Sequence, residues 1–136
     1  VLVGLHVKKN GKLPSNENIT DVVKKCKSES WLGVILACVS PEIIEKTISE
    51  VKQLDIPFGF KANLWKAEEP IPVHKFASPA DEMGANPTEV MGTRKDYTGL
   101  MFLEFSKKMM NKGATILGGC CETKPFHIKK ISGLKN

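Results

Sequence analysis

Apolar residues in this chain gather in four short runs, at residues 1–7, 32–38, 57–63 and 114–117. Runs of this length without strict alternation are typical of strands covered on both faces, as in parallel sheets. Between the runs, apolar residues recur three or four positions apart, which is the spacing of one helix face. The pattern therefore predicts strands that alternate with helices.

The predicted helices cover residues 17–27, 41–55, 96–112 and 123–134. The second has the clearest start, because Ser40 can cap it and Pro41 suits its first turn. Gly113 is a good stop for the third. On the first helix Cys26 falls on the apolar face, so we expect it to be a small buried side chain.

Alternating strands and helices imply an α/β fold with a parallel sheet and right-handed crossovers. Units of this kind can form a small open sheet or half of a (βα)8 barrel, and the pattern alone leaves both open. Residues 64–95 differ, because they hold four of the eight prolines and few periodic positions. A long segment without regular structure is usually functional or ordered by a partner.

Composition and charge restrict the function classes. The chain has 136 residues, 41% hydrophobic and 26% charged, which is typical of one globular domain over residues 1–136. Its net charge of +5 comes from lysines, since Arg94 is the only arginine, and no basic run is interleaved with aromatic residues. We therefore expect no nucleic-acid partner.

The apolar runs and the first residues of the sequence indicate where the protein is located. No run approaches the ~20 apolar residues that span a membrane, and the start, VLVGLHVKKN, lacks a signal-peptide pattern. We expect a cytoplasmic protein without a membrane partner. Because the sequence begins without methionine inside a predicted strand, we also expect it to be a piece of a longer protein.

The cysteines carry the candidate chemistry. Cys120 and Cys121 are adjacent, so their α-carbons lie about 3.8 Å apart, below the usual disulfide range of roughly 4.4–6.8 Å. Metal ligation by reduced thiols is the better use of this pair. Cys38 ends the second predicted strand, and Cys120 and Cys121 follow the fourth. Carboxyl ends of parallel strands share one edge, so the three thiols are expected to meet there.

Three thiolates suit Zn²⁺, and three protein ligands leave the fourth position open, as in catalytic zinc sites. Gly118 and Gly119 are expected to let the backbone turn tightly, so that both following thiols reach one ion. Such a centre is a weak Lewis acid but can hold a substrate thiol as thiolate. For a thiol of pKa about 8.5 this is roughly a 30-fold gain at pH 7, or about 2 kcal/mol.

Three segments resemble a known family. GGCCETKPFHI, which holds Cys120 and Cys121, is similar to the GGCCGTxPxHI signature of the homocysteine S-methyltransferase family. The segment through Cys38 to Glu42 resembles the family's GxNCxxPE, and residues 58–63 resemble its strand ending in PN. The resemblance implies a (βα)8 barrel, of which this chain is the carboxyl-terminal half, about strands 5–8.

The resemblance also implies a function. It indicates zinc held by Cys38, Cys120 and Cys121, and methyl transfer to the thiol of homocysteine, giving methionine. The expected partners are small molecules, homocysteine and a methyl donor that the sequence does not identify.

The chain departs from the family pattern at three positions. Ala37 replaces an asparagine and Ile35 a glycine before the first cysteine, and Glu122 replaces the glycine after the cysteine pair. These changes bear on activity more than on zinc binding. Glu122 can hydrogen-bond a substrate amine or face solvent. The alternatives to an active enzyme are a catalytically inactive zinc-binding or thiol-sensing domain and an incomplete fragment.

Other candidate residues have two interpretations each. Asn63, at a strand end, can bind polar groups of the substrate or serve as a turn residue. Trp65 and Phe76 can line a methyl-donor pocket or anchor the long segment, and anchoring is favoured. His127 is expected to be a helix-surface or packing residue and not a metal ligand. In half a barrel, unpaired edges at residues 1–7 and 114–117 would invite association into a homo-oligomer.

Overall fold

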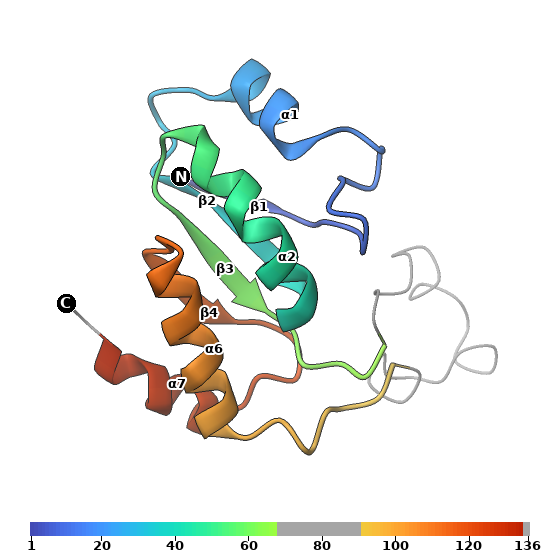
Figure 1. The fold of residues 1–136 in the computed structure, drawn as a ribbon, viewed down its shortest axis with the longest axis vertical. Helices are drawn as coiled ribbons and strands as arrows, with labels where there is room; N and C mark the ends of the chain where they lie inside the picture. Colours follow the sequence, from blue (N-terminus) through green and yellow to red (C-terminus); the bar gives the residue numbers. More distant parts are fainter. Residues whose placement is uncertain (68–90, 135–136) are drawn as a thin grey trace.

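The chain forms a four-stranded parallel sheet with helices against it, as seen in a computed structural model that describes residues 1–67 and 91–134 (Figure 1). The strands are β1 (Leu2–Leu5), β2 (Gly33–Val39), β3 (Phe58–Ala62) and β4 (Ile116–Gly119). The helices are α1 (Ile19–Cys26), α2 (Pro41–Val51), α6 (Gly99–Asn111) and α7 (Pro125–Ile131), with 3-10 turns η1 (Lys52–Leu54) and η2 (Ser132–Leu134).

The strand order is β1-β2-β3-β4, and every neighbouring pair is parallel. A doubly wound open sheet reverses its strand order at a switch point, whereas a (βα)8 barrel adds each strand beside the previous one. The predicted α/β class and parallel sheet are therefore confirmed, and the order is compatible with a barrel fragment. Closure into a barrel stays a prediction.

The core lies between the sheet and helices α2 and α6, which lie against the same face of the sheet (Figure 1). Val34 and Leu36 of β2 and Phe60 of β3 are buried there. Phe60 packs edge-on against Phe105 of α6, with ring centroids 4.9 Å apart. Side chains along a strand point alternately to its two faces. The opposite face of β3 carries Lys61, which is exposed.

The prediction for the first strand is wrong in one respect. The run at residues 1–7 was expected to form a strand buried on both faces, but β1 alternates between exposed and half-buried residues, and Leu2 is 51% exposed. An apolar run predicts a strand, but it does not show whether other elements cover one face of that strand or both. In the described residues, β1 is an edge strand with helices over one face only.

The helix starts follow local capping. Ser40 caps α2, since its Oγ accepts a hydrogen bond from the Ile43 amide at 3.4 Å, as predicted. The third predicted helix starts at Gly99 and not at residue 96, because Thr98 caps it by accepting from the Met101 amide. Gly113 follows this helix with a φ of +104°, which confirms it as the stop.

Two predictions are wrong: the burial of Cys26 and the tight turn at Gly118 and Gly119. Cys26 is exposed, because it is the last residue of α1, where the helix face no longer packs on the core. The fourth strand begins at Ile116 and includes Gly118 and Gly119, which pair with Lys61 and Ala62 of β3. The paired glycines are thus strand residues, and the turn begins after them.

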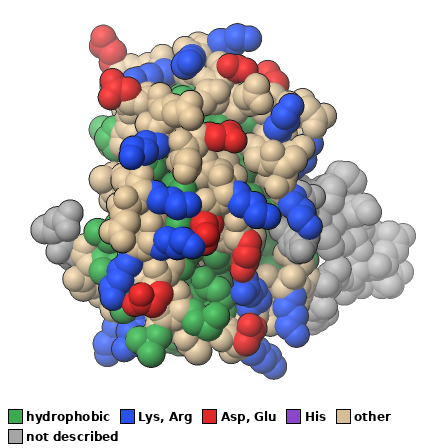
Figure 2. Space-filling model, viewed as in Figure 1, with side chains coloured by type: hydrophobic (Ala, Val, Ile, Leu, Met, Phe, Trp, Pro, Cys, Tyr) green, Lys and Arg blue, Asp and Glu red, His purple; other side chains and the backbone are tan. Residues whose placement is uncertain are grey.

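The surface over α2 and α6 carries lysine and acidic side chains interspersed (Figure 2). Ion pairs join Lys107 to Glu104 and Lys108 to Glu45. Among the helices that the structure describes, none is long and apolar enough to cross a membrane. Most of the proline-rich segment, with Phe76, lies outside the described residues.

Candidate metal centre

A β-bulge presents the first thiol. Ala37 of β2 pairs with Lys61, and Val39 pairs with Ala62, so Cys38 is an extra residue without a partner in β3. Its φ is +56°, a left-handed conformation that non-glycine residues rarely adopt. A bulge interrupts the ladder and redirects a side chain, as often occurs beside functional sites. The bulge therefore separates Cys38 from the regular alternation of the strand.

Asn63 supports this bulge. Its side-chain Nδ2 donates a hydrogen bond to the Cys38 carbonyl oxygen at 2.8 Å, and its Oδ1 accepts from the Trp65 amide at 3.4 Å. Only 2% of Asn63 is exposed. The side chain thus satisfies a carbonyl that the bulge takes out of the ladder. Substrate binding by Asn63 stays a prediction, whereas its contact with the ligand segment is a structural role.

The turn after β4 presents the other two thiols. The Cys120 amide donates to the Ala62 carbonyl at 2.7 Å and to Thr123 Oγ1 at 3.3 Å, while Thr123 Oγ1 itself donates to the Ala62 carbonyl at 3.1 Å. The Thr123 amide closes the turn on the Cys120 carbonyl at 3.1 Å. A β-carbon on Gly119 would lie 2.3 Å from Thr123 Cγ2, so only glycine permits this packing.

The three sulfur atoms meet. Cys38 Sγ lies 3.6 Å from Cys121 Sγ, and Cys120 Sγ lies 3.8 Å from Cys121 Sγ. All three lie within 4.8 Å of one another. Zinc–sulfur bonds of about 2.3 Å at tetrahedral angles place sulfur atoms about 3.8 Å apart. The donor set and its spacing therefore fit a zinc ion, and the predicted meeting of the three cysteines is confirmed.

Cys38 and Cys121 favour the protonated thiol when no cation is bound, because the pKa of each is raised. Burial, together with the negative charge of a Cys120 thiolate, raises the pKa of Cys38 to about 12. Burial also raises the pKa of Cys121. Three thiolates in one half-buried cluster repel each other, and a divalent cation between them would offset that repulsion. Metal binding here would release protons.

A family comparison agrees with this geometry. The sequence model of the homocysteine S-methyltransferase family matches residues 1–134. The chain belongs to the homocysteine S-methyltransferase family. A search of the curated proteins finds no match. The resemblance seen in the cysteine motifs is thus confirmed over nearly the whole chain, and the family is one of methyltransferases.

In this homocysteine S-methyltransferase family member, two of the candidate residues, His127 and Trp65, are buried in the packing of the protein. His127 is buried, with Nδ1 accepting from the Lys124 amide at 2.9 Å and Nε2 donating to the Tyr97 carbonyl at 2.8 Å. Both ring nitrogens are thus hydrogen-bonded within the protein, so His127 is a packing residue and the helix-surface alternative is wrong. Trp65 is also buried, and it forms a bridge with Thr93, which favours the anchoring interpretation.

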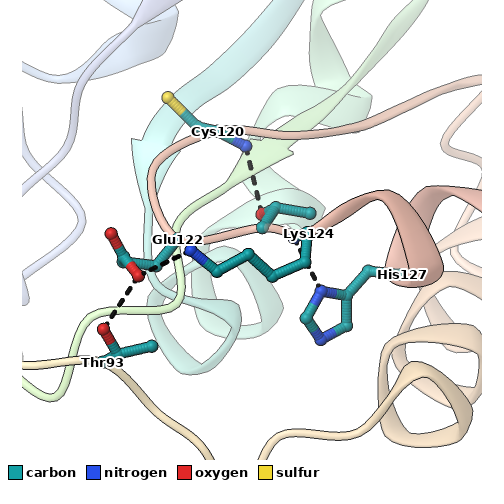
Figure 3. Close-up of polar contacts among 6 residues, drawn as sticks. Thr93, Cys120, Glu122, Lys124 and His127 are labelled. Carbon is teal, nitrogen blue, oxygen red and sulfur yellow. Dashed lines mark hydrogen bonds and ion pairs between the residues drawn. The ribbon is translucent and has the colours of Figure 1, made fainter.

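Glu122 has an environment that sequence reasoning missed. Its φ is +61°, so the position where the family signature has glycine adopts a left-handed conformation in this chain. The side chain is 14% exposed, and its Oε2 contacts Thr93 Oγ1 at 2.8 Å and Lys124 Nζ at 3.2 Å (Figure 3). The solvent-exposed alternative is therefore wrong. The signature glycine was the available signal for the conformation, but no pattern pointed to Thr93.

Proposed function

We propose that this protein catalyses zinc-dependent methyl transfer to the thiol of homocysteine, giving methionine. The observation that carries the proposal is the cluster of Cys38, Cys120 and Cys121, whose sulfur spacing fits zinc, in a chain of this family. The substrates are small molecules, homocysteine and a methyl donor. In the reaction a methyl–sulfur bond forms, the bond from the methyl group to its donor breaks, and the thiol proton is released.

The three cysteines would hold the ion, and when bound it would stabilise a substrate sulfur as thiolate. The chain's own groups prepare the ligands. Asn63 holds the bulge at Cys38, and Thr123 holds the turn at Cys120. All three cysteines are only partly buried, so a small thiol can reach them from solvent. Preorganised ligands lower the cost of placing a nucleophile beside its electrophile.

Metal analysis of the purified protein tests the proposal. We expect about one zinc per chain in the wild type and a loss of zinc in Cys38→Ser. Cys26→Ser is the matched control, because Cys26 is an exposed cysteine outside the cluster. On addition of homocysteine, X-ray absorption should show the sulfur coordination rising from three to four.

Activity then separates the enzyme from its alternative. Methionine should appear when homocysteine is supplied with a sulfonium, quaternary ammonium, folate-borne or corrinoid-borne methyl group. Zinc binding that is indifferent to homocysteine would support the alternative of an inactive zinc-binding or thiol-sensing domain, which Ala37 and Glu122 favour because both depart from the family signature. A wild-type chain that binds no zinc would refute both.

A further inference from the structure

Glu122 is a charged residue in a backbone conformation that suits glycine. Its φ of +61° lies in the left-handed region, where a β-carbon is crowded by the backbone. It directly follows Cys121 and precedes Thr123, so it sits inside the turn that carries two of the three thiols. A strained residue at such a place needs support from its surroundings.

The carboxylate contacts one distant segment, through Thr93, and one residue just beyond its own position, Lys124. Its Oε2 accepts a hydrogen bond from Thr93 Oγ1 at 2.8 Å and pairs with Lys124 Nζ at 3.2 Å (Figure 3). The side chain is 14% exposed, whereas Lys124 is 51% exposed. The better-shielded contact is therefore the one with Thr93, which is 29 residues away in sequence.

Thr93 belongs to a short antiparallel pairing, which we call the Trp65–Thr93 ladder. Its hydrogen bonds run from Lys66 N to Gly92 O at 2.9 Å, from Ala67 N to Met91 O at 3.0 Å and from Arg94 N to Leu64 O at 2.9 Å. The ladder also touches the metal-site turn directly, because the Leu64 amide donates to the Cys121 carbonyl at 3.0 Å. One strand of the ladder is thus fastened to the ligand turn by its backbone, and the other by Glu122.

We propose that Glu122 is a positioning residue for the metal centre. Its carboxylate fastens Thr93, and with it the Trp65–Thr93 ladder, to the turn that carries Cys120 and Cys121, and so sets where these two sulfur atoms lie. The inference rests on the proposed metal centre. Glu122 itself is not a ligand: among the described residues, the group whose ligand atoms come together consists of the three cysteines, without a carboxylate.

Two effects of Glu122 can be separated by substitution. Glu122→Gly removes both the left-handed strain and the carboxylate, so a role in strain alone predicts a more stable protein with metal affinity equal to the wild type or tighter. The positioning role predicts weaker metal binding despite the relieved strain. Glu122→Gln keeps an oxygen that accepts from Thr93, and Thr93→Val removes the hydroxyl that donates, at nearly constant shape.

The test uses Co²⁺ as a spectroscopic probe of the cysteine ligands, with affinity measured by chelator competition. We expect Glu122→Gly and Thr93→Val each to weaken Co²⁺ binding about 10-fold, the usual scale for groups that orient ligands, and to shift the sulfur-to-cobalt absorption band. The double variant should lose no more than the larger single loss, and Glu122→Gln should restore most of the affinity. Glu104→Gln is the matched control, since Glu104 forms an exposed ion pair with Lys107.

The outcomes distinguish the two proposals. If wild type and Glu122→Gly bind Co²⁺ with the same affinity and the same absorption band, Glu122 does not position the ligands, and the metal centre still stands. If the effects of Glu122→Gly and Thr93→Val add independently, the link between them is wrong. If the wild type binds no Co²⁺, the metal centre fails, and the positioning role fails with it.

Discussion

Replacing Asn63 by alanine should unfasten the first ligand segment. The change removes the hydrogen bond from Nδ2 to the Cys38 carbonyl, which is 2.8 Å long and formed by a side chain that is 2% exposed. A half-buried carbonyl left without a donor costs about 1–3 kcal/mol. Because Cys38 also has a φ of +56°, a left-handed conformation that costs roughly 1–2 kcal/mol, the bulge should relax toward a regular strand.

We therefore expect the free energy of unfolding to fall by about 2 kcal/mol and zinc affinity to fall about 10-fold, since 1.4 kcal/mol corresponds to a factor of ten. Urea unfolding of the metal-free protein and chelator competition for zinc measure the two quantities. Asn18→Ala is the control, because Asn18 is exposed and the hydrogen bond of its side chain that the structure describes goes to Asp21, without capping the amides of α1. Its effect should therefore stay within about 0.5 kcal/mol.

The reasoning would be refuted by an Asn63→Ala protein with wild-type stability and wild-type zinc affinity. A third result has its own meaning. If stability and zinc affinity are unchanged but more homocysteine is needed for half-maximal activity, Asn63 binds the substrate, which is one of the two roles that the sequence leaves open. The bulge is then held by its own ladder bonds on either side of Cys38.

Three further predictions follow from the packing and the thiols. Phe102→Ala, at a fully buried ring that packs on Phe60, should lower the free energy of unfolding by about 3–5 kcal/mol in denaturant titrations, and a loss below 1 kcal/mol would contradict the packing. Gly119→Ala should displace Thr123, whose Cγ2 a new β-carbon would meet at 2.3 Å, and so weaken zinc binding in chelator competition; unchanged affinity would show that the turn adapts. The metal-free protein should lose stability between its unfolded-state thiol pKa of about 9.0 and the folded value of about 12, because the unfolded chain releases the Cys38 proton first. Unfolding at increasing pH should show a smaller fall in Cys38→Ser and in the zinc-loaded protein than in the metal-free wild type. A fall should remain in Cys38→Ser because burial also raises the pKa of Cys121 and of Tyr97, and in the zinc-loaded protein because Tyr97 still titrates.

Local interactions made the helices and strands predictable. A serine before Pro41 and an apolar stripe behind it involve neighbours within a few residues, and α2 begins where they indicate. Where the prediction failed, a distant neighbour decided the result. Cys26 and the residues of β1 are exposed because of what does or does not pack against them, and periodicity does not record that.

The sequence by itself determined which atoms can form the metal centre. Cys38 ends one predicted strand, and Cys120 and Cys121 follow another, beside paired glycines. Strand direction in a parallel sheet brings those ends to one edge, so the sequence identified these three residues. Only the tertiary structure decided that the sulfur atoms of Cys38 and Cys121, 83 residues apart, lie 3.6 Å from each other. That distance depends on strand register, on the bulge that Asn63 holds and on the left-handed turn at Glu122. These features arise from contacts between segments far apart in the chain, so no local pattern contains them.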